Sequence, residues 1–217
     1  MGMNVGAQTT GWSLVWADEF SQPDGSLPDA SKWNYDTGGG GWGNSELETY
    51  TTTKARIQGG NLIIEADQKI SPETTNYTSA RLKSLGLGSW KYGRMEARIK
   101  IPRGQGIWPA FWMMGTNIAT AHWPTNGEID IMENIGREPA FVHGTMHGPG
   151  YSGGNGIGGS CALPGSTNFA NDFHIYAVEW TTNQIKWFVD SYQYFSANTA
   201  SISAGTTWIF TAPQFFC

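Results

Sequence analysis

Three acidic residues stand close together in one otherwise apolar stretch, Glu-Ile-Asp-Ile-Met-Glu. Glu128 and Asp130 alternate with isoleucines, which is the spacing of a β-strand and not of a loop. Carboxylates are rarely buried unless they have a partner or a function. Two carboxyl groups on the same side of a sugar can cleave a glycosidic bond, one as nucleophile and one as general acid. The stretch is therefore a candidate catalytic strand.

The alternation alone leaves the last acid on the wrong face. In a regular strand Glu128 and Asp130 share one face and Glu133 points to the other. A β-bulge at Ile131 and Met132 would turn Glu133 onto the face of the first two acids. The glutamates would then lie about four strand steps apart, and their side chains could lean together to roughly the 5–5.5 Å of a retaining glycosidase. The spacing predicts a bulged strand and a double displacement.

These residues also carry a family resemblance. Glu-Ile-Asp-Ile-Met-Glu resembles the active-site signature of glycoside hydrolase family 16, and the extra Met132 resembles its laminarinase, agarase and carrageenase branches. Trp-Pro-Thr-Asn-Gly at 123–127 and Trp-Pro-Ala-Phe-Trp-Met at 108–113 are similar to endo-β-1,3-glucanases (laminarinases). The resemblance runs from Trp-Ala-Asp-Glu-Phe at 16–20 to the last residue. It implies an all-β fold, a β-jelly-roll sandwich of two antiparallel sheets with a concave substrate cleft.

The resemblance also assigns roles to the acids, which the spacing alone does not distinguish. It makes Glu128 the nucleophile and Glu133 the acid that protonates the leaving oxygen and later activates water. Asp130 is expected between them on the same face, where its charge raises the proton affinity of its neighbours. A calcium loop is the alternative for such a trio, but calcium ligands are spread through a turn and not along a strand.

Further positions match the family's cleft and are expected to contact substrate. They are polar or aromatic residues in resembling segments: Asn44, Glu46, Arg81, Trp108, Trp112, Trp123 and His147. Packing in the core stays the alternative for the tryptophans and the histidine, and an ordinary surface position for the others. Glu48 and Thr49 depart from the Gln and Tyr common in the family, so no contact is inferred there. Trp16, Trp180 and Trp187 alternate within ordinary strands and are assigned to packing.

No metal or cofactor is expected. His143 and His147 would share a strand face, but a zinc site needs a third protein ligand, and no Cys, His or Glu set accompanies the pair in the sequence. His143 is left as structural or of unknown role. Some family members hold a structural calcium through main-chain oxygens matching Glu19 and Gly60 and through a late aspartate. That aspartate has no counterpart here.

Two glycine runs, residues 38–43 and 154–159, fit the Gly-x-Gly-x-x-Gly pattern of dinucleotide sites. Such a site requires a helix opening on the third glycine, and neither run is followed by a helical pattern. Both runs are predicted to be mobile loops at the rim of the cleft.

Composition supports one all-β domain over residues 1–217. Only 14% of the residues are charged, while the chain contains 29 glycines and 11 tryptophans. This composition disfavours disorder and suits turn-rich sheets with aromatic sugar platforms. A net charge of −5 does not favour binding to nucleic acid, and no apolar run in the sequence is as long as a membrane helix.

Short β-patterns recur along the chain, and no amphipathic helix of useful length is found. Strands are predicted at residues 13–16, 61–66, 92–101, 107–114, 142–147, 173–180 and 185–189. In the 92–101 strand Met95, Ala97 and Ile99 are expected to face the core and the charged residues to face water.

The two ends of the chain carry further expectations. Residues 1–8 lack the basic and apolar regions of a signal peptide, so secretion is implied by the resemblance alone. Family members continue beyond a segment like residues 206–216 into another concave strand and a last outer strand. An open sheet edge and self-association through it are therefore predicted. Whether Cys161 and Cys217 form a disulfide stays open.

The expected function is endo-acting, retaining hydrolysis of β-1,3-glucosidic bonds in β-glucans such as laminarin. One alternative is hydrolysis of another β-glycan, either mixed-linkage β-1,3-1,4-glucan or agarose. The alternative from another class is a non-catalytic glucan-binding module, and the presence of both Glu128 and Glu133 disfavours it.

Overall fold

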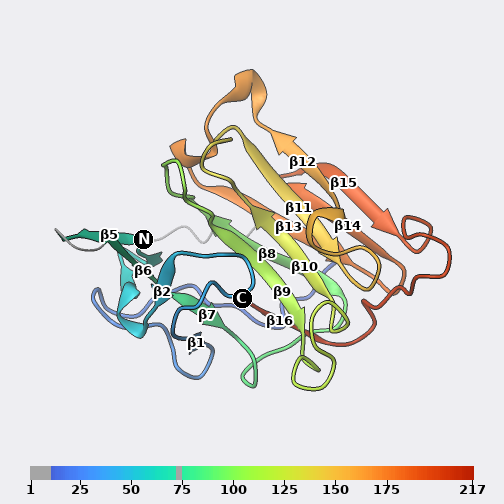
Figure 1. Ribbon diagram of the computed structural model, residues 1–217, viewed down its shortest axis with the longest axis horizontal. Helices are drawn as coiled ribbons and strands as arrows, with labels where there is room; N and C mark the ends of the chain where they lie inside the picture. The colour runs from blue at the N-terminus through green and yellow to red at the C-terminus, as the bar shows by residue number, and fades with distance from the viewer. Residues whose placement is uncertain (1–10, 72–74) are drawn as a thin grey trace.

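The computed structural model describes residues 11–71 and 75–217, and its regular structure is almost entirely β-strand (Figure 1). The larger of two main sheets, here the inner sheet, has the strand order β12-β11-β10-β9-β16. Its strands are β9 (Ala110–Gly115), β10 (Glu128–Glu133), β11 (Phe141–His147), β12 (Ile157–Ala162) and β16 (Gln214–Phe216). All of its pairings are antiparallel, so sequence neighbours β9, β10, β11 and β12 lie side by side.

The second main sheet, here the outer sheet, packs behind the inner one with the order β15-β14-β13-β8. Its strands are β8 (Gly93–Ile99), β13 (His174–Trp180), β14 (Gln184–Val189) and β15 (Tyr192–Asn198). One core cluster joins the two sheets, with Ile129 and Ile131 of β10 facing residues such as Val178 and Ile185. Each fully buried aliphatic side chain of this kind contributes roughly 1.5–3 kcal/mol. The packing confirms the predicted all-β sandwich of two antiparallel sheets.

The N-terminal part of the chain forms three small sheets beside the sandwich (Figure 1). Their strands are β1 (Asn34–Asp36), β2 (Glu48–Tyr50), β3 (Ala55–Gln58), β4 (Asn61–Ile64), β5 (Asp67–Ile70), β6 (Thr75–Ser79) and β7 (Arg81–Lys83). Helical structure in the described residues is limited to short 3₁₀ turns: η1 (Thr52–Lys54), η2 (Gly153–Asn155), η3 (Pro164–Ser166) and η4 (Phe169–Asn171). None of these turns is long and apolar enough to cross a membrane.

Most of the predicted strands are present, but the one at residues 13–16 is not. Leu14 and Val15 are 85% and 81% exposed, and only Trp16 packs inward, against Trp33 and Trp90. The apolar pattern was misleading because no strand among the described residues pairs with this segment. In β8 the prediction is confirmed, since Met95 is buried. The predicted lack of a signal peptide in residues 1–8 lies outside the described residues.

The prediction for glycine run 154–159 is wrong in part, because Ile157–Ala162 is strand β12. Its glycines serve close packing and not mobility. A Cβ on Gly159 would lie 2.7 Å from the Phe195 ring, and one on Gly158 would lie 2.5 Å from the Gly144 carbonyl oxygen. The other run, residues 38–43, is irregular as predicted.

The last residues form the edge strand of the inner sheet beside β9. Gln214–Phe216 pairs with β9 as β16, so three residues occupy that edge of the inner sheet. In the outer sheet, β8 pairs with β13 alone within residues 11–71 and 75–217. Cys161 and Cys217 are both free thiols, which answers the question the sequence leaves open.

Candidate active site

Strand β10 places all three acids on one face through the predicted bulge. It shifts register after Asp130 relative to both of its neighbours, β9 and β11. The two residues at the bulge, Ile131 and Met132, are each 1% exposed and both belong to the core cluster. Because these two apolar side chains occupy the core side in succession, Glu133 returns to the face of Glu128. The predicted position of the bulge is confirmed.

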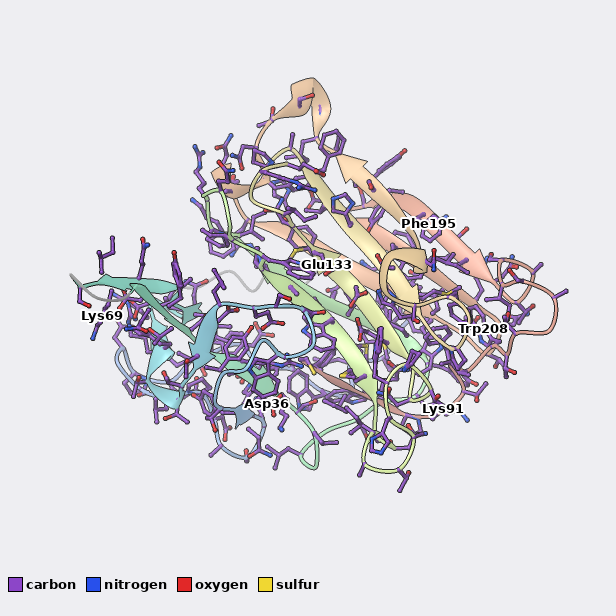
Figure 2. The ribbon with its side chains drawn as sticks, in the orientation of Figure 1. Asp36, Lys69, Lys91, Glu133, Phe195 and Trp208 are labelled. Atoms are coloured by element: carbon purple, nitrogen blue, oxygen red, sulfur yellow. The ribbon has the colours of Figure 1, made fainter. Side chains whose placement is uncertain are left out.

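The acid face continues onto the neighbouring strands, because directly opposite residues in a sheet share a face. On β11 the opposite residues of Glu128, Asp130 and Glu133 are His147, Thr145 and His143. On β9 they are Met114, Trp112 and Ala110. Figure 2 shows Glu133 over the inner sheet and Asp36 among the N-terminal strands. The structure thus gathers His147 and Trp112 around the acids, as predicted.

Each glutamate accepts a hydrogen bond from one tryptophan. The indole Nε1 of Trp123 donates to Oε2 of Glu128 at 2.8 Å. The indole Nε1 of Trp108 donates to Oε1 of Glu133, also at 2.8 Å. Both indoles are about half exposed, at 46% and 52%, so they line the open side of the site. Sequence reasoning placed these tryptophans at the cleft but missed their role as donors to the acids.

His147 is the nearest basic side chain to the acids. Its Nε2 lies 3.0 Å from Oδ2 of Asp130 and 3.8 Å from Oε1 of Glu128. The ligand atoms of these three residues all lie within 4.8 Å of one another, so they could hold a metal ion. This group does not include His143, so the pair considered in the sequence is not the one that the structure brings together. The companions of His147 are the acids of β10.

Burial dominates the electrostatics of the three acids. It raises the pKa of Glu128 to about 8, and the charge of Asp130 adds to that rise, while His147 and the Trp123 indole oppose it. Burial, with the charge of Glu133, raises the pKa of Asp130 well above its usual range. Burial also raises the pKa of Glu133, against the opposing effects of the Trp108 hydrogen bond and His147. The acid face is therefore built to keep carboxyl protons near neutral pH.

Arg81 joins the acid face to the N-terminal strands. Its guanidinium carbon lies 4.8 Å from the ring centroid of Trp112 on one side and 4.8 Å from that of Trp42 on the other. Its Nε lies 3.3 Å from Oδ2 of Asp36, which also pairs with Lys83. Sequence reasoning missed Trp42 and Asp36 as neighbours of the site. The only local signal was a tryptophan inside a glycine run.

Asn44 and Glu46 are connected to this arm. Asn44 Nδ2 donates to Glu46 Oε1 at 3.0 Å, and the Tyr50 hydroxyl donates to Glu46 Oε2 at 2.6 Å. The Tyr50 ring meets the Trp42 ring edge to face, with centroids 5.6 Å apart. A continuous series of contacts therefore leads from both predicted polar residues, through Trp42 and Arg81, to the acid face.

His143 lies on β11, directly opposite Glu133 of β10. Its Nδ1 is hydrogen-bonded to the Ser160 hydroxyl at 2.8 Å, and its Nε2 lies 3.8 Å from Oε2 of Glu138. The ring is thus held by β12 and by the turn after β10. It has local partners on the acid face.

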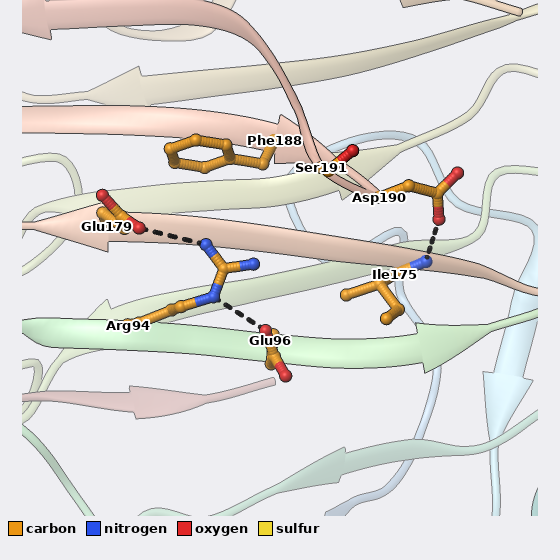
Figure 3. Close-up of a pocket in the computed structure, with 7 residues that line it drawn as sticks. All are labelled: Arg94, Glu96, Ile175, Glu179, Phe188, Asp190 and Ser191. Carbon is orange, nitrogen blue, oxygen red and sulfur yellow. Dashed lines mark hydrogen bonds and ion pairs between the residues drawn. The ribbon is translucent and has the colours of Figure 1, made fainter. Parts of the chain in front are cut away.

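A pocket of about 470 Å³ lies elsewhere, on the solvent face of the outer sheet (Figure 3). Its lining residues are Arg94, Glu96, Ile175, Glu179, Phe188, Asp190 and Ser191. Arg94 forms ion pairs with Glu96 at 2.8 Å and with Glu179 at 3.2 Å, and it lies over the Phe188 ring. Because Arg94 pairs with Glu96 and Glu179 and His174 pairs with Asp190, this pocket lacks a group of unpaired buried acids like that on β10.

Known proteins match this chain over most of its length. The model for "Glycosyl hydrolases family 16" matches residues 47–214. A beta-glucanase of Rhodothermus marinus is 49% identical over 191 residues, covering 85% of this chain and 65% of that protein. Glucan endo-1,3-beta-glucosidase A1 of Niallia circulans is 41% identical, over 83% of this chain and 28% of that protein.

Solved structures agree with the sequence relatives. The laminarinase catalytic domain of Thermotoga maritima MSB8 superposes with a TM-score of 0.87 at 44% identity, covering 94% of this chain and 85% of that one. The chain thus spans less than two thirds of the two curated relatives named above, but most of a catalytic domain. With its β-jelly-roll fold and its bulged acidic strand, the chain belongs to glycosyl hydrolase family 16.

Proposed function

We propose that the chain is an endo-acting glycoside hydrolase that cleaves β-1,3-glucosidic bonds in β-glucans such as laminarin, with retention of configuration. The observation that carries this proposal is the placement of Glu128 and Glu133 on one face of β10, each with an indole donor. The names of the relatives, a glucan endo-1,3-beta-glucosidase and a laminarinase among them, support the linkage.

In the first step Glu128 attacks the anomeric carbon and forms a covalent glycosyl-enzyme ester. Glu133 donates its proton to the glycosidic oxygen, so the bond between that oxygen and the anomeric carbon breaks and the aglycone leaves as an alcohol. Burial, which raises the pKa of Glu133, favours the protonated form needed here.

In the second step Glu133, now ionised, takes a proton from water as the water oxygen attacks the anomeric carbon. The ester to Glu128 breaks, and both carboxyl groups return to their starting forms. Two inversions at one carbon give net retention.

Asp130 determines which of the neighbouring carboxyl groups is protonated. Its side chain is 4% exposed and that of Glu128 is 16% exposed, so burial favours Asp130 as the holder of the proton they share. The reactive form then has Glu128 ionised and Asp130 protonated. His147, within 3.0 Å of Asp130, orients that carboxyl group.

Substrate contacts are proposed on both sides of the acids. Trp108 and Trp123 border the reacting sugars, and Trp112 offers an aromatic face beside Asp130. Arg81, Asn44 and Glu46 provide polar contacts along the arm that leads to the N-terminal strands.

Reducing-sugar release from laminarin tests the proposal, with mixed-linkage glucan and agarose as parallel substrates. Short oligosaccharides from laminarin are the expected product, and proton NMR of the first product should show the β-anomer. Release only from one of the other two glycans would reassign the substrate, and an initial α-anomer would exclude retention.

Glu133→Gln separates a hydrolase from a glucan-binding module. The amide cannot supply a proton, so hydrolysis should fall by roughly 10²–10⁴-fold while laminarin binding, measured by calorimetry, is kept. A wild-type chain that binds laminarin and releases no sugar from any glycan would favour the binding module.

A further inference from the structure

The bulge in β10 faces a single residue of β11. Asp130 is the last residue in register with both neighbouring strands, opposite Thr145, and Glu133 resumes the pairing opposite His143. Gly144 therefore opposes Ile131 and Met132 together. A bulge interrupts the regular ladder of main-chain hydrogen bonds, so other groups must hold the strand in place at this point.

A tryptophan of the outer sheet reaches across the core to the place where the register breaks. The Nε1 of Trp187, in β14, donates to the main-chain oxygen of Asp130 at 2.8 Å. Trp187 is 0% exposed, and the hydrogen bond is buried. A buried bond of this kind is expensive to lose, because the carbonyl would be left without a donor and without water.

Gly144 makes the room for this contact. A Cβ at Gly144 would collide with Cδ1 of Trp187 and with the Tyr194 hydroxyl, and it would lie 2.7 Å from the Trp187 Nε1. The residue opposite the bulge is thus the one with no side chain, and the indole fills that space. The bulge of β10, Gly144 and the Trp187 indole therefore pack directly against one another.

We propose that Trp187 is a positioning residue: its indole N–H fixes the Asp130 carbonyl and so holds Glu133 on the face of Glu128. This inference rests on the proposed function of the acids and adds a residue of the outer sheet to their support. Its effect would be felt at Glu133, the first residue after the bulge that is in register with both neighbouring strands. A displacement of about 1 Å at a reacting group can lower a rate by roughly 10²-fold.

The chain offers a matched control in Trp180 of β13. Trp180 is also 0% exposed, and its Nε1 donates to the main-chain oxygen of Phe210, a residue outside β10, at 3.1 Å. Trp187→Phe and Trp180→Phe each remove one buried indole donor and leave a similar space. Both should lower the free energy of unfolding by a similar amount, measured by urea denaturation.

Only Trp187→Phe should lower kcat on laminarin, by roughly 10–100-fold with KM changed less than threefold. A second probe replaces Trp187 with 3-benzothienylalanine, in which sulfur stands in place of the N–H and the ring shape is kept. It should reproduce the loss of kcat in a fully folded protein. An unchanged kcat with this isostere, or equal losses in the two Phe variants, would overturn the proposal.

A readout without turnover separates this inference from the proposed function. In ¹³C NMR titrations with labelled glutamate, the Glu133 carboxyl should titrate at a different pH in Trp187→Phe than in the wild type and in Trp180→Phe. If the wild type hydrolyses no glycan, the proposed function fails and this titration still decides the positioning role. Identical Glu133 titrations in all three proteins would refute it.

Discussion

Strands β8 and β10 both alternate charged and apolar residues, β10 only as far as its bulge, but they use their charges in opposite ways. In β8, Arg94 lies between Glu96 and the neighbouring Glu179, and the ion pairs face solvent on the outer sheet. In β10 all the charged side chains are acids, and Asp130 is only 3% exposed. One strand neutralises its charges, while the other concentrates a single sign in a buried place.

The difference shows which charges have a chemical role. The carboxylates paired with Arg94 are 37% and 26% exposed, and ion pairs open to solvent in this way contribute about 0–1 kcal/mol each, so β8 needs no function to explain them. Buried like charges raise the pKa values of their carboxyl groups and oppose folding, and such groups concentrate at functional sites. Substitution of a charged residue is therefore expected to affect activity and stability differently in the two strands.

The largest difference is expected in turnover. Glu128→Gln removes the proposed nucleophile and should lower kcat/KM on laminarin by more than about 10³-fold, the loss of one essential step. Glu96→Gln in β8 removes only a surface charge and should leave kcat/KM within about twofold. Reducing-sugar assays on both variants check this, and a weak effect of Glu128→Gln would remove the basis for the double displacement.

The next effect is the dependence of stability on pH. The pKa of Glu128 is raised from 4.5 to about 8 on folding, so the folded protein holds more protons than the unfolded chain between these values. Stability from this group is complete below about pH 4.5 and is lost as the pH rises toward 8. Glu128→Gln should reduce the decline in unfolding free energy between pH 5 and 8 by on the order of 2–4 kcal/mol.

Urea denaturation at the two pH values measures this decline. Glu179→Gln, on the outer sheet, serves as the control and should leave the decline as it is in the wild type. If the unfolding free energy changes equally between pH 5 and 8 in the wild type and in Glu128→Gln, then burial does not raise the pKa of Glu128.

A smaller effect distinguishes the roles of the two glutamates. Trp108→Phe removes the hydrogen bond that lowers the pKa of Glu133, so the basic limb of the kcat/KM profile should move to higher pH. Trp123→Phe removes the bond that lowers the pKa of Glu128, so the acidic limb should move to higher pH. If Trp108→Phe moved the acidic limb and Trp123→Phe moved the basic limb, then Glu133 would be the nucleophile and Glu128 the acid.

The smallest effect belongs to β8. Glu179→Gln breaks one of the two ion pairs of Arg94 and should change the unfolding free energy by less than about 1 kcal/mol, since Glu96 keeps the guanidinium paired. Addition of 1 M salt should erase even this difference. A loss of several kcal/mol would mean that the surface pairs of β8 support the fold as strongly as its core does.

The bulge of β10, the strand with the proposed catalytic acids, was predictable because regular alternation would separate those acids. Glu128 and Glu133 fall on opposite faces of a regular strand, and a bulge at Ile131 and Met132 is the simplest way to reunite them. The strand at 92–101 was predictable for a plainer reason, the clean alternation around Met95. Local patterns suffice where the signal lies within one strand.

Contacts between distant segments were not predictable. Nothing near Trp187 in the sequence says that its indole reaches Asp130, and nothing near Trp42 says that it covers Arg81. Residues 13–16 have an apolar strand pattern, yet a strand requires a partner, which is a property of the whole fold. Gly158 and Gly159 look like loop residues until the Phe195 ring is seen against them.

The outer-sheet pocket of Figure 3 has a practical consequence. Its residues project away from the core, while the acids of β10 project from the other side of the sandwich, so the two faces are opposed. A linker attached at Ser191 would therefore anchor the protein to a bead or sensor surface with the cleft facing the solution. Ser191 therefore offers a site for oriented immobilisation. Large glucans would still reach the acids of the immobilised protein.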